Sequence, residues 1–193
     1  MYMTVLKMTR QSILNASNFL DLNDTNAVHQ WLCNQQDSNR SDAGILYKII
    51  NKKDEIFVYI QSKTVFNISN IEDFGFIYIK SLDLHNINLD KITTFDVQCV
   101  PCKQKDGKSF FIKNTVDRYN WLQKQFEKHG IQLLSCTEYK LSNIIMTKNR
   151  PIRFETASYR GNIKIIDKEL ALDLLINGLG RLKNYGCGLL LVK

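Results

Sequence analysis

The sequence has little proline, little glycine and no long hydrophobic run. Of its 193 residues, 2 are proline and 9 are glycine, while 44% are hydrophobic and 23% are charged. Collagen-like and linker-like chains need far more glycine and proline, and a membrane-spanning helix needs about 20 consecutive apolar residues. These absences exclude all three classes and predict a folded chain with room for one large core or two modest ones.

An export signal is also missing, because the N-terminal stretch MYMTVLKMTR lacks a basic region, an apolar core and a small-residue cleavage site in that order. The cysteines are few, odd in number and scattered along the chain, at Cys33, Cys99, Cys102, Cys136 and Cys187. This pattern suits reduced thiols, so we expect a cytoplasmic protein with no membrane partner.

A single C-x-x-C motif runs from Cys99 to Cys102 and has the spacing of a redox pair or half of a zinc site. The sequence has no second such pair, and no pair of histidines, to complete a tetrahedral site. The residues that follow include Asp106 and Gly107, which predict a turn where a thioredoxin-like motif would open a helix. The motif therefore predicts neither redox nor metal chemistry.

Positive charge is confined to the second half of the chain. Residues 1–91 carry 9 Lys and Arg against 10 Asp and Glu, a balance of −1, whereas residues 92–193 carry 17 against 9, a balance of +8. Such asymmetry fits a surface for a polyanion, with nucleic acid as the leading candidate. A basic face that is only solvated is the alternative.

Hydrophobic periodicity predicts the same order of elements, β-α-β-β-α-β, in each half. In the first half we predict strands at 2–7, 45–50, 55–61 and 76–82 and helical segments at 24–35 and 68–74. In the second half we predict strands at 93–100, 131–145, 153–166 and 188–192 and helices at 115–129 and 168–176. The predicted fold class is α+β, with two tandem ferredoxin-like (RRM-like) domains that contain antiparallel sheets and span residues 1–91 and 92–193.

Four of the nine glycines fall within the eleven residues of segment 178–188. A helix precedes this loop and a strand follows it, which is the reverse of a dinucleotide-binding loop. One interpretation is a glycine cap at the end of the helix, followed by a turn. The other is a loop that brings backbone N–H groups, Arg181 and Lys183 close to a phosphate backbone.

The loop matches the pattern G-x-G-x-x-K-x-x-G-C-G-L-L through Gly178, Gly180, Lys183, Gly186, Cys187, Gly188, Leu189 and Leu190. This pattern resembles the CasE family of type I-E CRISPR systems, which are repeat-processing endoribonucleases of the RAMP superfamily. Further features of that family recur in order: a helix that bears His29, a hairpin with Leu46-Tyr47, Trp121-Leu122, and Arg153-Phe154-Glu155. The resemblance covers nearly the whole chain.

The resemblance implies metal-independent cleavage of RNA, in which a ribose 2′-OH attacks the adjacent phosphate and leaves a 2′,3′-cyclic phosphate and a 5′-OH. No metal and no cofactor are expected. His29 falls at the family position of the catalytic base or acid. Many members have Tyr three residues earlier, where this chain has Asn26, and some have Lys at the position of Asn34. Tyr47 or Lys48 is the predicted substitute for the missing group.

The family also implies where RNA binds and what the protein assembles with. Lys148, Arg150 and Arg153 match a basic hairpin that contacts the stem of the repeat, where cations read shape rather than sequence. The remaining predicted RNA contacts are Tyr159, Arg160, Gly178, Gly180, Arg181, Lys183 and Gly186. The implied partners are a CRISPR repeat stem-loop and the other subunits of a type I-E surveillance complex.

Two other functions stay open at this point. One is a non-catalytic RNA-binding subunit with the same architecture, in which the absent Tyr leaves only binding. The other is a stand-alone RRM-like binding module, which would need neither His29 nor the glycine loop.

Overall fold

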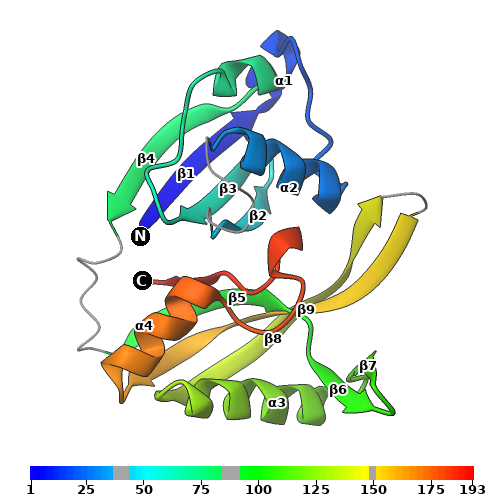
Figure 1. The fold of residues 1–193 in the computed structure, drawn as a ribbon, viewed down its shortest axis with the longest axis vertical. Helices are drawn as coiled ribbons and strands as arrows, with labels where there is room; N and C mark the ends of the chain where they lie inside the picture. Colours follow the sequence, from blue (N-terminus) through cyan, green and yellow to red (C-terminus); the bar gives the residue numbers. More distant parts are fainter. Residues whose placement is uncertain (37–43, 84–91, 148–150) are drawn as a thin grey trace. The chain divides into compact units, whose positions relative to one another are not determined.

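The computed structural model describes residues 1–36, 44–83, 92–147 and 151–193 (Figure 1). The chain forms two compact units that interleave in sequence. The first comprises residues 1–87, 145–152 and 184–186, and the second comprises residues 88–144, 153–183 and 187–193. The predicted domain boundary at residue 91 falls outside the described residues and stays a prediction.

The first unit is a four-stranded antiparallel sheet with the strand order β2-β3-β1-β4. Its strands are β1 (Tyr2–Thr9), β2 (Leu46–Lys52), β3 (Glu55–Ser62) and β4 (Ile77–Asp83). Its helical segments are α1 (Arg10–Asn15), α2 (Thr25–Asn34) and the 3₁₀ turn η1 (Ile71–Phe74). This order and pairing are those of a ferredoxin-like domain in which a single 3₁₀ turn replaces the second helix.

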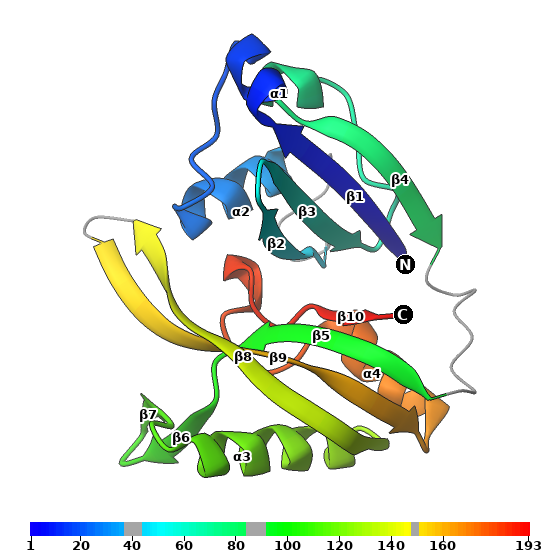
Figure 2. The ribbon, with the colours of Figure 1, turned by 180° about the vertical axis from the view of Figure 1, so that it is seen from behind.

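The second unit repeats this plan with the strand order β10-β5-β9-β8. Its sheet contains β5 (Thr93–Cys99), β8 (Ile131–Thr147), β9 (Pro151–Ile165) and β10 (Leu190–Val192). Its helices are α3 (Thr115–Lys128) and α4 (Lys168–Asn177), and η3 (Lys183–Tyr185) is a 3₁₀ turn within the glycine-rich segment. A separate hairpin of β6 (Cys102–Lys105) and β7 (Lys108–Phe111) precedes α3, as both views show (Figures 1 and 2).

Each unit has its own core. In the first, Trp31 of α2 stacks on Phe76 with ring centroids 5.0 Å apart, and Val28 and Leu32 pack from the same helical face. In the second, Phe95 of β5 meets Phe126 of α3 edge to face at 5.1 Å. The predicted pair of ferredoxin-like domains is therefore confirmed as a fold.

Three elements were not predicted: α1, the β6–β7 hairpin and η3. The hairpin turns at Asp106 and Gly107, whose φ angles of 50° and 70° are those of a type I′ turn. Cys99 ends β5 and Cys102 begins β6, so the C-x-x-C motif opens no helix. Among the described residues, no helix is both long enough and apolar enough to span a bilayer.

Candidate functional site

His29 lies in the middle of α2, the helix that covers the sheet of the first unit. It is only 4% exposed, and the Sγ atom of Cys33, one turn later, lies 3.7 Å from its Nε2 and 3.8 Å from its Nδ1. The ring of Tyr185 meets the imidazole in an edge contact, with ring centroids 5.9 Å apart and an interplanar angle of 61°. The histidine predicted from sequence therefore has an aromatic neighbour from the far end of the chain.

The start of α2 is held by the end of β8. Asp24 caps the helix by accepting from the N–H of Asn26 at 2.9 Å, and the same carboxylate accepts from the N–H of Thr147 at 3.3 Å. Thr25 donates from Oγ1 to the carbonyl of Ile145 at 2.7 Å, and Asn26 donates from Nδ2 to the carbonyl of Thr147 at 3.0 Å. Asn26, at the position where many CasE proteins have Tyr, thus has a structural role, because its side chain links the start of α2 to the end of β8.

Tyr47, a predicted catalytic group, packs inside the first unit. Its ring is 1% exposed and belongs to the core of the first unit, and its hydroxyl donates to the carbonyl of Thr25 at 3.0 Å. Lys48, the other predicted substitute, is 2% exposed. A buried tyrosine whose hydroxyl is held by a helix carbonyl anchors that helix, and a catalytic role of Tyr47 stays a prediction.

The sequence does not single out Tyr185, because it lies 156 positions after His29 and no local spacing links the two. It ends the turn η3 and is followed by Gly186, which has a φ angle of 80°. A Cβ atom added to Gly186 would lie 3.0 Å from Cε2 of Tyr47. The glycine therefore lets this turn pack directly on the buried Tyr47 and thereby determines where Tyr185 lies.

The other predicted loop glycines have visible structural reasons. Gly178 caps α4 with a φ angle of 72°, and its N–H donates to the carbonyl of Leu174 at 2.8 Å. Gly180 has a φ angle of 75°, and an added Cβ would lie 3.3 Å from Cη2 of Trp121. Helix capping and close packing account for these two positions, and their contact with RNA stays a prediction.

The predicted RNA contacts divide into three groups. Lys148 and Arg150 lie outside the described residues. Arg153, Arg160 and Arg181 are exposed, and Lys183 is half-buried. Tyr159 is 1% exposed in the core of the second unit, where burial raises its pKa, and its contact with RNA stays a prediction.

Of the exposed arginines, Arg160 lies over the ring of Tyr139, 4.8 Å from its centroid, and donates to Asp96 at 3.1 Å. Arg181 donates to the hydroxyl of Ser109 in β7. These contacts hold both guanidinium groups at the surface of the second unit, where a phosphate can reach them.

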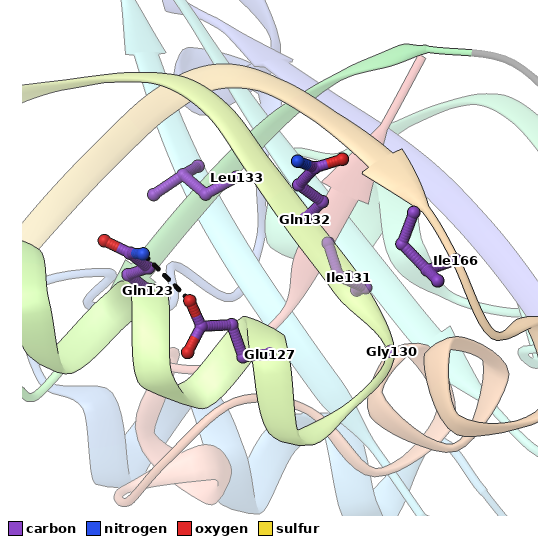
Figure 3. A pocket seen from close by; sticks show the side chains of 7 residues that line it. All are labelled: Gln123, Glu127, Gly130, Ile131, Gln132, Leu133 and Ile166. Carbon is purple, nitrogen blue, oxygen red and sulfur yellow. Dashed lines mark hydrogen bonds between the residues drawn. The ribbon is translucent and has the colours of Figure 1, made fainter.

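A pocket of about 490 Å³ lies in the second unit where α3 ends and β8 begins (Figure 3). It is lined by Gln123, Glu127, Gly130, Ile131, Gln132, Leu133 and Ile166. None of these residues is basic, so this pocket is not suited to a phosphate. Within the described residues, no three His, Cys, Asp or Glu side chains gather as a metal site would require.

Comparison with known proteins places this chain in a family. A family model described as "CRISPR associated protein" matches residues 1–193. The chain belongs to the CRISPR-associated protein family. The family membership predicted from the glycine-rich loop is therefore confirmed. No curated protein matches the sequence.

Solved structures of this family have the same fold over the full length. The chain is similar to the CRISPR endoribonuclease Cse3 bound to a 19-nucleotide RNA, with a TM-score of 0.87, 18% identity and 100% of both chains covered. It is also similar to Thermus thermophilus Cse3 bound to an RNA representing a pre-cleavage complex, with a TM-score of 0.83, 17% identity and 100% of both chains covered. A chain of a CRISPR RNA-guided surveillance complex matches with a TM-score of 0.72 and 16% identity, over 100% of this chain and 98% of that one.

Proposed function

We propose that this protein is a metal-independent endoribonuclease that cleaves CRISPR precursor RNA at the repeat stem-loop. The observation that supports this function most strongly is the pairing of His29 with Tyr185, because the chain lacks the usual Tyr of the CasE pattern. We further propose that the protein retains the mature guide RNA and joins the other subunits of a type I-E surveillance complex. The endoribonuclease and surveillance-complex structures that share its fold support this proposal.

The reaction needs two proton transfers and no protein nucleophile. The ribose 2′-OH loses a proton as its oxygen attacks the adjacent phosphorus, and the 5′-oxygen gains a proton as its bond to phosphorus breaks. The products are a 2′,3′-cyclic phosphate and a 5′-OH. A histidine can accept the first proton near neutral pH, and a phenol carries its own proton there and can donate the second.

The geometry of the pair suits this division of roles. The two rings are in edge contact with centroids 5.9 Å apart, so both groups could reach one phosphodiester that lies across the pair. Tyr185 is half-buried and His29 is buried, so the RNA would meet Tyr185 first. We assign His29 as the base toward the 2′-OH and Tyr185 as the acid toward the leaving 5′-oxygen.

Single-turnover cleavage of a repeat stem-loop tests these roles. Replacing His29 with Ala should lower the rate by roughly 100-fold or more with little change in RNA affinity, because the group acts in the transition state. Tyr185→Phe should also lower the rate. Tyr78→Phe, which removes a hydroxyl from a ring that is 41% exposed on β4, is the matched control and should cleave like the parent.

A substrate with sulfur in place of the bridging 5′-oxygen separates the acid from the base. A thiolate leaves without a proton, so the Tyr185→Phe defect should vanish on this substrate while the His29→Ala defect remains. A Tyr185→Phe defect of equal size on both substrates would show that Tyr185 only positions His29. Full activity of the His29→Ala variant would remove His29 from the mechanism.

The alternative is a non-catalytic RNA-binding subunit with the same fold. Asn26 favours it, since this side chain replaces a family tyrosine and is bonded to the backbone of Thr147. A parent protein that binds the stem-loop tightly but leaves it intact would establish this alternative.

A further inference from the structure

The β6–β7 hairpin of the second unit carries an unusual face. In the antiparallel register, Lys103 lies opposite Phe110 and Lys105 lies opposite Lys108. Residues opposite each other, and residues two apart on one strand, point to the same side of a hairpin. One side therefore consists of Lys103, Lys105, Lys108 and Phe110, which we call the lysine face. All four residues are exposed, and Phe110 retains 46% of its accessible surface.

The opposite side fastens the hairpin to the second unit. Phe111 lies beneath the guanidinium of Arg118, 5.7 Å from its ring centroid, and Ile112 donates its N–H to the carbonyl of Pro101 at 3.0 Å. Ser109 accepts from Nε2 of Gln104 at 2.9 Å and also from the guanidinium of Arg181. The bonds of Ile112 to Pro101 and of Gln104 to Ser109 hold the two strands together, and the contacts with Arg118 and Arg181 hold the hairpin on the second unit, so the lysine face is presented on an anchored element.

The lysine face does not serve folding. Like charges directly opposite each other destabilise a hairpin, as Lys105 and Lys108 do here. Among the described residues, no salt bridge involves any of the three lysines of this face. Phe110 adds little hydrophobic stabilisation, because much of its surface stays exposed. Three cations beside one exposed aromatic ring suit a single-stranded nucleic acid, whose phosphates can contact the cations and whose unpaired bases can stack on the ring.

We infer that the lysine face binds a single-stranded segment of RNA, with phosphates at the three lysines and a base stacked on Phe110. A duplex hides the faces of its bases, so it would leave Phe110 unused, whereas an unpaired strand satisfies both parts of the face. This inference rests on the proposed function, and the bound segment would be the unpaired RNA that adjoins the repeat stem.

The test measures binding of a short oligouridylate, which forms no stem, by fluorescence anisotropy across a range of salt concentrations. Changing Lys103, Lys105 and Lys108 to Ala should weaken binding and reduce the slope of log K against log salt by about 2, since each phosphate contact on a single strand contributes roughly 0.7. Phe110→Ala should weaken binding about tenfold, and Phe110→Trp should restore it.

The matched control changes three exposed lysines elsewhere on the second unit, Lys124, Lys128 and Lys164, to Ala. It removes the same charge and should change the affinity much less than the lysine-face triple variant. Equal losses of affinity from the two triple variants would overturn the inference, because they would indicate that RNA responds only to the net positive charge of the protein. Unchanged affinity for the oligouridylate in the lysine-face and Phe110→Ala variants would also overturn it. The lysine face would then suit an acidic protein partner instead. Thermal melts confirm that each variant is folded.

Cleavage of the repeat stem-loop by the same preparations separates this inference from the proposed function. If the parent cleaves the stem-loop but the lysine-face variants bind the oligouridylate normally, the single-strand site fails and the endoribonuclease proposal stands. If the parent does not cleave but oligouridylate binding depends on Lys103, Lys105, Lys108 and Phe110, the site stands and the endoribonuclease proposal fails.

Discussion

Gly186→Ala should impair cleavage far more than it impairs folding. Its Cβ would lie 3.0 Å from Cε2 of Tyr47, closer than carbon atoms pack, and the backbone there has a φ angle of 80°. Tyr47 cannot yield, because its ring is 1% exposed and its hydroxyl is bonded to Thr25. The turn that carries Tyr185 must therefore shift away from α2 and His29.

The magnitude follows from the two consequences of this shift. A left-handed backbone costs an alanine about 1–2 kcal/mol, which in a protein of this size corresponds to about 2–8 °C in Tm. A misplacement of about 1 Å at a catalytic group can lower the rate by up to about 100-fold. We expect a single-turnover rate at least tenfold below the parent in a protein that remains folded.

Gly75→Ala is the matched control for strain. Gly75 has a φ angle of 78°, and its added Cβ would lie 2.9 Å from the carbonyl oxygen of Ser12, so the backbone strain and the crowding are nearly those of Gly186→Ala. It follows η1, and its added Cβ would meet only α1 and the residue just after it, not His29 or Tyr185. We expect a similar loss of Tm and a cleavage rate within about twofold of the parent. Equal rates in the two variants, with both folded, would refute the reasoning that Gly186 places Tyr185.

Two further predictions concern the second unit and the basic hairpin. Arg118 donates to both carboxylate oxygens of Glu138 at 2.7 and 2.6 Å, and this pairing lowers the pKa of Glu138. The stability that this pairing contributes is therefore present above the unfolded pKa of Glu138 and is lost as pH falls through its lower folded pKa. Glu138→Gln should cost about 3 kcal/mol at pH 7, because it leaves the buried Arg118 charge without its partner, and in thermal melts the variant should lose less stability on acidification than the parent. An equal loss on acidification in the two proteins would contradict this. Changing Lys148, Arg150 and Arg153 to Ala should reduce the salt slope of stem-loop binding by up to about 3, and an unchanged slope and affinity would mean that this tip is only solvated.

Much of the fold could be predicted because the local patterns agree with the tertiary structure. In α2, a capping Asp24 precedes apolar residues at helical spacing, and the structure buries that face. The β6–β7 hairpin was predicted only as a turn. Its two short strands are mostly polar, with lysines along one side, so they lack the alternation of apolar and polar residues that predicts a strand.

The candidate site was harder to predict than the fold. His29 came from a family resemblance, since one histidine on an amphipathic helix has no distinguishing local pattern. Tyr47 was predicted because it lies on a strand next to the helix of His29, and Tyr185 was not singled out, since burial and packing are tertiary properties that spacing does not reveal. His29 and Tyr185, far apart in sequence, are in contact where the glycine-rich turn packs on Tyr47.

The products of one reaction test the central claim most directly. The parent protein is incubated with a repeat stem-loop in the presence of EDTA, and the new RNA ends are identified by mass spectrometry. The account predicts a single cut that leaves a 2′,3′-cyclic phosphate and a 5′-OH, with EDTA making no difference to the rate. An intact stem-loop, or products with a 3′-OH and a 5′-phosphate, would contradict it.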